Sequence, residues 1–349
     1  MAGELREDSV FVSDQKEGSR LYNKGNYGYP RSGGSLELDL MEAQYLLESN
    51  RLEVEKDGKP VGFEELFRHS SMAVEGFDIK YLVYRDLRSR GFIVKTESGR
   101  FDMSVFPRGM TLSNSRPEFL VRAVSERSAL DISDFSSELT QTEKKGKELL
   151  YGVADEEGDV TYYRMSTRNP GGNVHADTSG KKTSGVLISD RVFVFDENDR
   201  AVLKEMGFFG KEVGNSVQLS LIESCYLAER GALKVINPEG KNVSAGALKK
   251  LGSESQGDFD LRISAYYDLR ERGMVVKTGF KYGTHFRVYE GSPDDSHARY
   301  LVHAVSASDV TMWPEISRTV RLSGGVRKDI LFCRISDSVE YLEFKWFRP

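Results

Sequence analysis

Cysteine is scarce in this sequence, which contains only Cys225 and Cys333 among 349 residues. Two cysteines so far apart have none of the short spacings of a zinc site, and they are too few for a disulfide framework. We therefore expect both to be reduced, buried thiols in a reducing compartment.

Long apolar runs are also missing. No stretch approaches the roughly 20 apolar residues that a membrane-spanning helix needs. The first eight residues, Met1 to Asp8, contain no apolar segment of the kind that signal peptides have. These absences predict a soluble, cytoplasmic protein without a membrane partner.

An excess of positive charge is the third absence. The 49 Lys and Arg are outnumbered by 54 Asp and Glu, which gives a net charge of −5. Proteins that coat nucleic acid without specificity depend on clustered Lys and Arg, so the balance argues against that class. It leaves open a nucleic-acid enzyme with a local basic patch. With 39% hydrophobic residues, the chain is long enough for two domains or more.

The chain contains the same unit twice. Residues 84–96 recur as residues 267–278, and the core of the match is shifted by 182 positions, from Leu87 to Leu269. Other matches keep nearly the same shift: Phe11 with Phe193, Gly28 with Gly210, Glu42 with Glu223, and Phe119 with Tyr300. A shift this constant indicates duplication of one unit of roughly 165 residues.

A segment rich in Gly, Ser, Asn and Asp separates the two copies. Such a composition, without apolar periodicity, is typical of a linker. We expect an N-terminal copy over residues 1–167, a flexible linker over 168–185 and a C-terminal copy over 186–349. The C-terminal copy is expected to divide into an N-terminal subdomain, 186–256, and a catalytic subdomain, 257–349.

Each copy is predicted to have a mixed α/β (α+β) fold, in which a small α+β part precedes a mixed sheet flanked by helices. In the second copy the pattern predicts helices over 216–231 and 259–272, and a third from Pro314 to Gly325. Gly273 fits the position that follows a helix end. Strands are predicted over 186–195 (a short pair), 274–278, 284–289, 300–305, 329–335 and 339–346.

The two copies differ where chemistry could reside. The second copy has a phenol and an imidazole where the first has a phenyl ring and a guanidinium, and both keep an ammonium group at a third position. The pairs are Tyr289 with Phe106, His297 with Arg116, and Lys328 with Lys147. Neither a phenyl ring nor a guanidinium can act as a base near neutral pH. The first copy is therefore predicted to be a scaffold and the second copy the enzyme.

Several motifs of the second copy, in one order along the chain, carry a resemblance to a known family. They are VKTGFKYG at 276–283, FRVY ending at Tyr289, a short acidic loop, HARYLV starting at His297, VRL around Arg321, and VRK ending at Lys328. Together they resemble archaeal tRNA-splicing endonucleases of the homodimeric type, whose chain carries two copies. The resemblance covers the whole chain. It implies an inactive N-terminal copy and a catalytic C-terminal copy with a restriction-endonuclease-like mixed sheet.

The resemblance assigns the catalytic triad of that family to Tyr289, His297 and Lys328. In the family, a ribose 2′-OH attacks the adjacent phosphate and leaves a 2′,3′-cyclic phosphate and a 5′-OH, with no metal or other cofactor. His297 would be the general acid, and Lys328 would stabilise charge in the transition state. Tyr289 would take the 2′-OH proton or orient the hydroxyl, since a phenol in water is a weak base at neutral pH.

The resemblance also implies how the substrate, a precursor tRNA with a bulge-helix-bulge motif, is held. The family stacks a flipped bulge base between two flat side chains, which here would be Arg321 and Trp346. Arg318 shares a helix face with Arg321, and Arg287 and Arg327 could complete a local basic patch.

An acidic loop of the family inserts into the partner subunit, and Asp294 and Asp295 match that loop. The substrate has approximate two-fold symmetry and is cut twice. A C2 homodimer would therefore present two copies of the triad to it.

Plainer interpretations exist for every one of these residues. Tyr289 could be an ordinary strand aromatic, His297 a loop histidine, Lys328 a surface lysine near a helix end, Trp346 a core residue, and Asp294-Asp295 a solvated turn. His285 could line the site or be a satisfied strand residue, and His303 is expected to be structural. The triad order, together with its loss in the first copy, favours the catalytic interpretation.

Two alternative functions compete with this one. Pro293-Asp294 followed by Glu343-Phe344-Lys345 imitates the PD…ExK signature of Mg²⁺-dependent nucleases, although the gap between them is too long for that motif. A catalytically idle RNA-binding subunit is the other alternative, and the intact triad argues against it.

Overall fold

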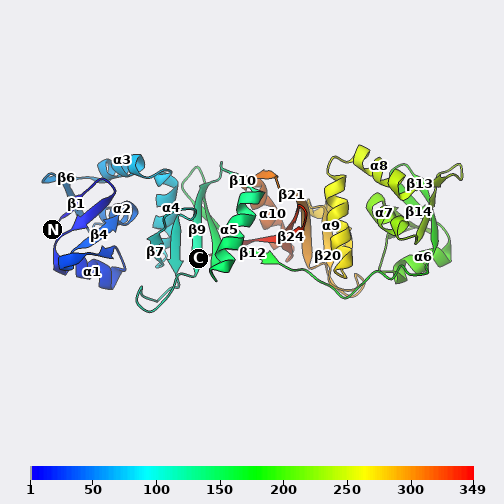
Figure 1. The fold of residues 1–349 in the computed structure, drawn as a ribbon, viewed down its shortest axis with the longest axis horizontal. Coiled ribbons are helices and arrows are strands. Elements are labelled where there is room, and N and C mark those ends of the chain that lie inside the picture. Colours follow the sequence, from blue (N-terminus) through cyan, green and yellow to red (C-terminus); the bar gives the residue numbers. More distant parts are fainter. Residues whose placement is uncertain (1) are drawn as a thin grey trace.

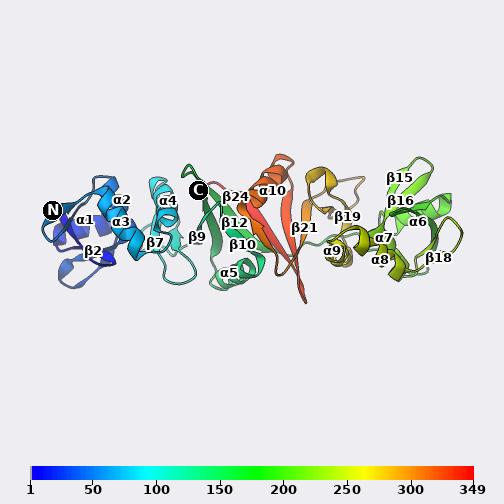
Figure 2. The same cartoon turned by 90° about the horizontal axis from the view of Figure 1, so that it is seen from above.

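The computed structural model describes residues 2–349, which form an elongated molecule (Figure 1). Two small sheets lie at opposite ends of the long axis and one large sheet occupies the middle (Figure 2). The N-terminal subdomains of the two copies form the ends, and their second subdomains meet in the centre. This arrangement confirms the predicted mixed α/β fold with a duplicated unit. None of the described helices is long and apolar enough to cross a membrane.

The N-terminal subdomain of the first copy is a six-stranded sheet with the order β3-β4-β2-β1-β5-β6. Its strands are β1 (Ala2–Leu5), β2 (Ser9–Val12), β3 (Tyr29–Pro30), β4 (Leu36–Asp39), β5 (Glu53–Lys56) and β6 (Lys59–Val61). Its helices are α1 (Gln15–Gly25), α2 (Leu40–Glu48) and α3 (Phe63–Ala73), with a 3-10 turn η1 (Ser32–Gly34). Helix α2 begins where it does because Asp39 and Glu42 form a capping box, in which each side chain accepts from the backbone N–H of the other.

The N-terminal subdomain of the second copy repeats this arrangement, with the order β15-β16-β14-β13-β17-β18. Its strands are β13 (Thr183–Ile188), β14 (Arg191–Val194), β15 (Lys211–Val213), β16 (Ser216–Ser220), β17 (Leu233–Ile236) and β18 (Asn242–Val243). Its helices are α6 (Glu197–Glu205), α7 (Leu221–Glu229) and α8 (Ala245–Ser255).

The predicted helix over 216–231 is wrong in its first part. Residues Ser216–Ser220 form strand β16, which pairs with β14 and β15, and helix α7 begins only at Leu221. Val217 and Leu219 are buried on one face of this strand. Their spacing of two residues belongs to a strand, and the capping box of Ser220 and Glu223 starts the helix after it.

The large sheet has ten strands in the order β19-β20-β21-β23-β24-β12-β11-β9-β8-β7. The first copy contributes β7 (Ile93–Thr96), β8 (Met103–Phe106), β9 (Phe119–Ser125), β11 (Glu148–Ala154) and β12 (Val160–Arg168). The second copy contributes β19 (Val275–Thr278), β20 (Phe286–Tyr289), β21 (Tyr300–Ser306), β23 (Asp329–Ile335) and β24 (Val339–Phe347). The two halves join where β12 and β24 pair antiparallel, with Tyr163 opposite Trp346.

Four helices cover the large sheet: α4 (Phe77–Ser89) and α5 (Ile132–Lys144) in the first copy, and α9 (Phe259–Glu271) and α10 (Trp313–Gly325) in the second. Helices α5 and α10 share one apolar cluster, in which Trp313 lies 5.0 Å from Tyr151 and 5.6 Å from Tyr163, between ring centroids. A further pair of short strands, β10 (Ala129–Asp131) and β22 (Val310–Met312), joins the copies beside it. The helices predicted over 259–272 and 314–325, and the strands predicted from 274 to 346, are confirmed to within two residues at each end.

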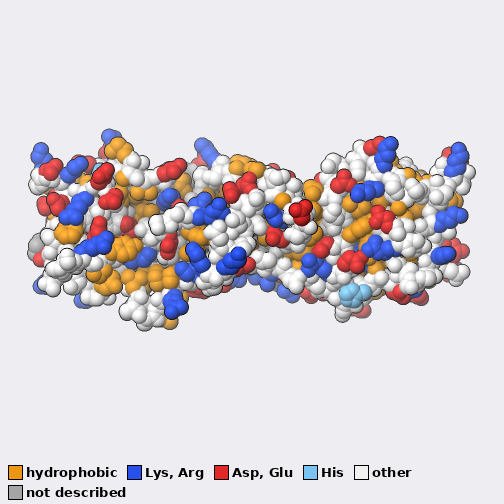
Figure 3. Space-filling view, viewed as in Figure 1, with side chains coloured by type: hydrophobic (Ala, Val, Ile, Leu, Met, Phe, Trp, Pro, Cys, Tyr) orange, Lys and Arg blue, Asp and Glu red, His pale blue; other side chains and the backbone are white. Residues whose placement is uncertain are grey.

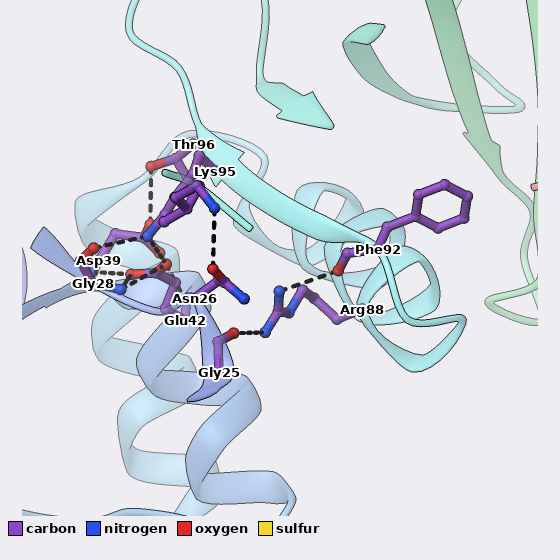
Figure 4. A network of polar contacts seen from close by, with 10 residues as sticks. Gly25, Asn26, Gly28, Asp39, Glu42, Arg88, Phe92, Lys95 and Thr96 are labelled. Atoms are coloured by element: carbon purple, nitrogen blue, oxygen red, sulfur yellow. Dashed lines mark hydrogen bonds and ion pairs between the residues drawn. The ribbon is translucent and has the colours of Figure 1, made fainter. Parts of the chain in front are cut away.

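In each copy a buried polar network fixes the N-terminal subdomain to the central sheet, and Figure 4 shows the network of the first copy. In the first copy, Lys95 on β7 donates to Glu42 (2.7 Å) and to the backbone oxygen of Gly28 (2.9 Å), while the Gly28 N–H donates to Glu42 (3.0 Å). Arg88 of α4 donates to the backbone oxygens of Gly25 and Phe92. These bonds cross between the two subdomains, which makes relative movement of the subdomains costly.

The second copy repeats the network with equivalent residues. Lys277 donates to the Gly210 oxygen (2.6 Å) and pairs with Glu223 (3.5 Å), and Arg270 donates to the oxygens of Gly207 and Met274. Residues 169–182 connect the two copies, because β12 runs through Arg168 and β13 begins at Thr183.

Candidate functional site

The strand order brings the three triad positions to one end of three neighbouring strands. Strand β20 runs antiparallel to β21, with Val288 opposite Tyr300, and β21 runs parallel to β23, with Tyr300 opposite Asp329. Tyr289 therefore ends β20 at the same place where β21 and β23 begin. His297 lies three residues before the start of β21, and Lys328 immediately precedes β23.

Backbone hydrogen bonds tie these strand ends together. The Arg299 N–H donates to the Val288 oxygen (2.9 Å), and the Asp329 N–H donates to the Arg299 oxygen (3.2 Å). Positions beside Tyr289, His297 and Lys328 are thus linked directly. The sheet brings the three chain positions together although they span 40 residues of sequence.

Tyr289 is a buried side chain, 8% exposed, in a small apolar cluster with Val275 and Ala298. The Arg287 guanidinium lies 5.9 Å from the centre of its ring. Arg287 is half-buried, and its Nε has no hydrogen-bond partner among the described residues. The Tyr289 side chain is therefore held by apolar packing and has a cation nearby.

His297 is exposed and follows the acidic loop Glu290–Ser296. The loop is shaped by its own hydrogen bonds, in which the Asp294 N–H donates to the Ser292 hydroxyl and the Ser296 hydroxyl donates to the Ser292 oxygen. Asp294 also pairs with Lys204 of α6 at 2.9 Å, and this bond raises the pKa of Lys204. Both partners are about 60% exposed, so the pair contributes little to stability.

Lys328 stands at the end of α10, where its N–H donates to the Ser323 oxygen (3.0 Å) and closes the helix. The preceding residue, Arg327, adopts a left-handed backbone conformation with φ of 54° and is exposed. The Lys328 ammonium lies 5.8 Å from the ring centre of Tyr282, in the turn η2 (Phe280–Tyr282). Lys328 therefore has a fixed backbone and a side chain that reaches across the sheet face.

A surface cavity of about 420 Å³ connects Lys328 with the two residues predicted to stack on a base. It is lined from α10, β23 and β24 by a set that includes Arg321, Arg327, Lys328 and Trp346. Trp346 is 48% exposed, so it is a surface residue and not part of the core. Arg318, one turn earlier on α10, is exposed but lies outside the lining.

A second cavity, of about 770 Å³, separates the N-terminal subdomain of the second copy from its catalytic subdomain. Tyr289, Pro293 and Asp294 reach its wall. Cationic side chains outnumber anionic ones there: the cations are Arg191, Arg200, Lys204, Lys211, Arg262, Lys277 and Arg287, and the anions are Asp190, Glu212, Glu223 and Asp294. The wall of this cavity thus has a local excess of positive charge, and Arg287 is the one residue of the predicted basic patch that lies in it. Figure 3 shows acidic and basic side chains interspersed along the face it displays.

The other histidines of the second copy are held in structural hydrogen bonds. His285 Nδ1 accepts from the Ala304 N–H (3.0 Å) and its Nε2 lies 3.2 Å from Asp258. Burial lowers the pKa of His285 to about 4, so this ring is neutral at pH 7. His303 Nε2 bonds the Gly283 oxygen (3.1 Å), and burial lowers its pKa too.

Asp294 and Glu343, the two carboxylates of the pattern that imitates PD…ExK, form ion pairs with different basic residues. Glu343 is buried on β24 and pairs with Arg168 of β12 at 2.9 Å, whereas Asp294 lies in the exposed loop with Lys204. No group of three or more His, Cys, Asp or Glu among residues 2–349 is arranged to hold a metal ion.

One neighbour of the candidate site was missed by the sequence analysis. The Arg348 guanidinium lies 4.2 Å above the ring centre of Trp346. A cation two residues after an exposed aromatic at a strand end is the signal that could have identified it. Arg348 already occupies one face of the indole.

Comparisons with known proteins agree with this organisation. The family described as "tRNA intron endonuclease, N-terminal domain" matches residues 1–67 and 183–249, and the family described as "tRNA intron endonuclease, catalytic C-terminal domain" matches 77–162 and 259–341. Each domain thus occurs twice, as the duplication predicts.

Curated relatives match over nearly the whole chain. A tRNA-splicing endonuclease of Methanococcoides burtonii is 37% identical over 98% of both chains, and one of Methanosarcina mazei is 36% identical over 97% of both. One of Haloferax volcanii is 33% identical, again over 97% of both chains. The chain therefore belongs to the tRNA intron endonuclease family and is an enzyme that acts on tRNA introns.

Proposed function

We propose that this enzyme removes introns from precursor tRNA by cutting at bulge-helix-bulge motifs, without a metal ion. The ribose 2′-OH at the cut site attacks the adjacent phosphorus, the bond to the 5′ oxygen breaks, and that oxygen takes a proton. The products are a 2′,3′-cyclic phosphate and a 5′-OH. The nucleophile belongs to the substrate, so the protein has only to align it and to move protons.

The observation that supports this proposal is that the chain positions of Tyr289, His297 and Lys328 lie at the same end of β20, β21 and β23. His297, exposed to solvent, gives a proton to the leaving 5′ oxygen. Lys328 stabilises the additional negative charge of the transition state. Tyr289 takes the proton of the 2′-OH or orients that hydroxyl. The first copy, with Phe106 and Arg116 at equivalent strand ends, can do neither of the proton transfers.

The smaller cavity supports the proposed mode of substrate binding. Arg321 and Trp346 hold a base that is flipped out of a bulge, since guanidinium and indole faces both stack on bases. Arg327 and Lys328 border the same cavity and contact the backbone phosphates next to that base. Arg318 and Arg287 extend the positive surface on either side.

The larger cavity supports a homodimer. Its excess of cationic side chains suits an acidic segment, and Asp294 and Asp295 of a second copy supply one. A two-fold symmetric pair of chains presents two active sites to an RNA that is cut twice.

The test uses the purified protein in EDTA with a bulge-helix-bulge RNA and a matched RNA whose bulges are closed by base pairing. We expect two cuts in the bulged RNA alone, with cyclic phosphate and 5′-OH ends. Cleavage that needs added Mg²⁺, or that leaves 5′-phosphate ends, contradicts the proposed chemistry and revives the PD…ExK alternative.

A further inference from the structure

The segment that joins the two copies runs beside the candidate site. It leaves β12 at Arg168 and passes along the lower end of α9 on its way to α6 (Figure 1). Its beginning is fastened on the second copy, because Arg168 pairs with Glu343 and Arg272 donates to the Asn169 side chain (2.5 Å). Further on, the Asp177 N–H donates to the Met206 oxygen (3.2 Å). The segment therefore has the composition of a flexible linker, but it is hydrogen-bonded to the second copy at several points.

Three consecutive residues of this segment, 172–174, donate hydrogen bonds to the backbone just before β19 and just after β20. Both positions lie at the end of this strand pair where Tyr289 is found. The Gly172 N–H donates to the Arg272 oxygen (3.0 Å) and the Val174 N–H to the Gly273 oxygen (2.8 Å), both in the turn between α9 and β19. Between them, the Asn173 N–H donates to the oxygen of Glu290 (2.9 Å). Glu290 directly follows Tyr289, so the segment holds the backbone at the exit of β20.

Gly172 permits this approach because it has no side chain. A Cβ at this position would lie 2.5 Å from the Gly273 oxygen and 2.7 Å from the Glu290 oxygen. Both obstacles are backbone atoms, so neither could move aside without displacing the turn or the strand end. Any larger residue would push the segment away from β20.

Val174 adds an apolar contact. It packs against the cluster of Val275, Tyr289 and Ala298, together with Phe208 of the N-terminal subdomain. Val275 lies directly opposite Tyr289 in the ladder, and Ala298 directly follows His297. One side chain from outside the catalytic sheet thus packs on the cluster that supports two of the three triad positions.

The connecting segment lies along the second copy, where Tyr289 takes the place of Phe106. Phe106 needs only to fill space. A catalytic hydroxyl has to be held at a defined position relative to the phosphate, because a displacement of about 1 Å can reduce a rate roughly 100-fold.

We propose that Gly172, Asn173 and Val174 are positioning residues of the active site, and that they act through Tyr289 and the loop that carries His297. This inference rests on the proposed function and deepens it. The connecting segment is then a structural part of the catalytic copy, although the chain attaches it to the inactive one.

The experiment measures single-turnover cleavage by the full chain and, separately, the Kd for an RNA with 2′-deoxy residues at both cut sites. We expect Val174→Gly to lower the cleavage rate about tenfold or more with an unchanged Kd and unfolding midpoint. Val174→Ile, which keeps an apolar side chain at this position, should cleave at the parent rate. Ser179→Gly, at an exposed residue of the same segment, should also leave the rate unchanged. If Val174→Gly does not fold, Gly172→Ala displaces the segment without removing an apolar contact.

A double-mutant cycle distinguishes positioning from general loosening. In a Tyr289→Phe background, Val174→Gly should cause much less than its full loss, because the part that acts through the hydroxyl is already gone and only the part that acts through the His297 loop remains. A wild-type rate for Val174→Gly, or a loss that multiplies with that of Tyr289→Phe, overturns the inference. Wild-type cleavage by Tyr289→Phe alone would instead contradict the proposed function itself.

Discussion

Phe106 and Tyr289 differ by one oxygen atom and occupy equivalent strand ends, on β8 and β20. Both residues are 8% exposed, so the two positions are buried to the same extent. What the second copy adds at this position is a hydroxyl. A comparison of the copies could therefore nominate the triad positions from sequence. It could not identify Val174, whose contacts are with residues distant in sequence, whereas the spacing of Arg348 from Trp346 was a local signal that went unused.

At the residue scale, replacement of the proposed general acid gives the most direct test of the triad. His297→Ala should reduce the cleavage rate about 10²- to 10⁴-fold, because the leaving oxygen then departs without a proton. His297 is exposed, so folding should be unaffected. Single-turnover kinetics measures the change. The matched control is Arg116→Ala at the equivalent exposed position of the first copy, which should cleave normally, and an equal loss there would contradict the assignment.

Trp346 allows a test of substrate binding that is independent of chemistry. Trp346→Ala should weaken the Kd for the uncleavable RNA about tenfold, since stacking of one base on an aromatic ring contributes about 1–3 kcal/mol. Trp346→Phe should retain much of the affinity. The half-exposed indole is not needed for the core. Unchanged binding by Trp346→Ala, measured by fluorescence titration, would remove this residue from the RNA site.

At the scale of elements, the sequence predicted the central strands well because each has a clear alternation or a glycine boundary. It failed for β16 because Val217 and Leu219 precede the apolar residues of α7 without a break, so a single helix fitted both. The capping pair Ser220 and Glu223 carried the correct boundary. The joining of β12 to β24 could not be predicted, since strand pairing between the copies leaves no local pattern in the sequence.

The β20–β21 pair also makes stability depend on pH through His285. Its Nδ1 accepts from the Ala304 N–H, so protonation at that atom breaks the bond. Because the folded state lowers the pKa of His285 to about 4, stability is fully present above the unfolded pKa of about 6.5 and is lost as pH falls towards 4.

We expect His285→Asn to remove much of this dependence. Urea unfolding of the parent chain should show a loss of about 1–2 kcal/mol between pH 7 and pH 5, and the variant should show less. His69→Asn, at a half-buried histidine of the first copy, is the control and should keep the parent slope. An unchanged slope in His285→Asn would exclude this residue as the source.

At the scale of the whole molecule, the larger cavity of the second copy is a cleft between its two subdomains, and Asp294 of the acidic loop lies on its wall. Asp294→Lys combined with Asp295→Lys should convert the proposed dimer into a monomer, because the substituted loop would repel the cationic wall of the partner's cleft. Sedimentation at micromolar concentration measures the mass. High salt should act in the same direction on the parent chain.

Glu156→Lys with Glu157→Lys, in an exposed turn of the first copy, changes the net charge equally and should leave the dimer intact. A monomeric parent chain that still makes both cuts would contradict the proposed assembly.

The pairing of β12 with β24 has a consequence for how this protein could be divided. Each is a nine-residue strand, and either half alone would present this strand with one edge unpaired, as a template for pairing with any other exposed strand. Within one chain the correct partner is always present at high effective concentration, whatever the protein's abundance in the cell. Because the two copies are fused, the pairing of β12 with β24 does not depend on the expression level. Two separately made halves would have to meet each other before their exposed strand edges aggregate.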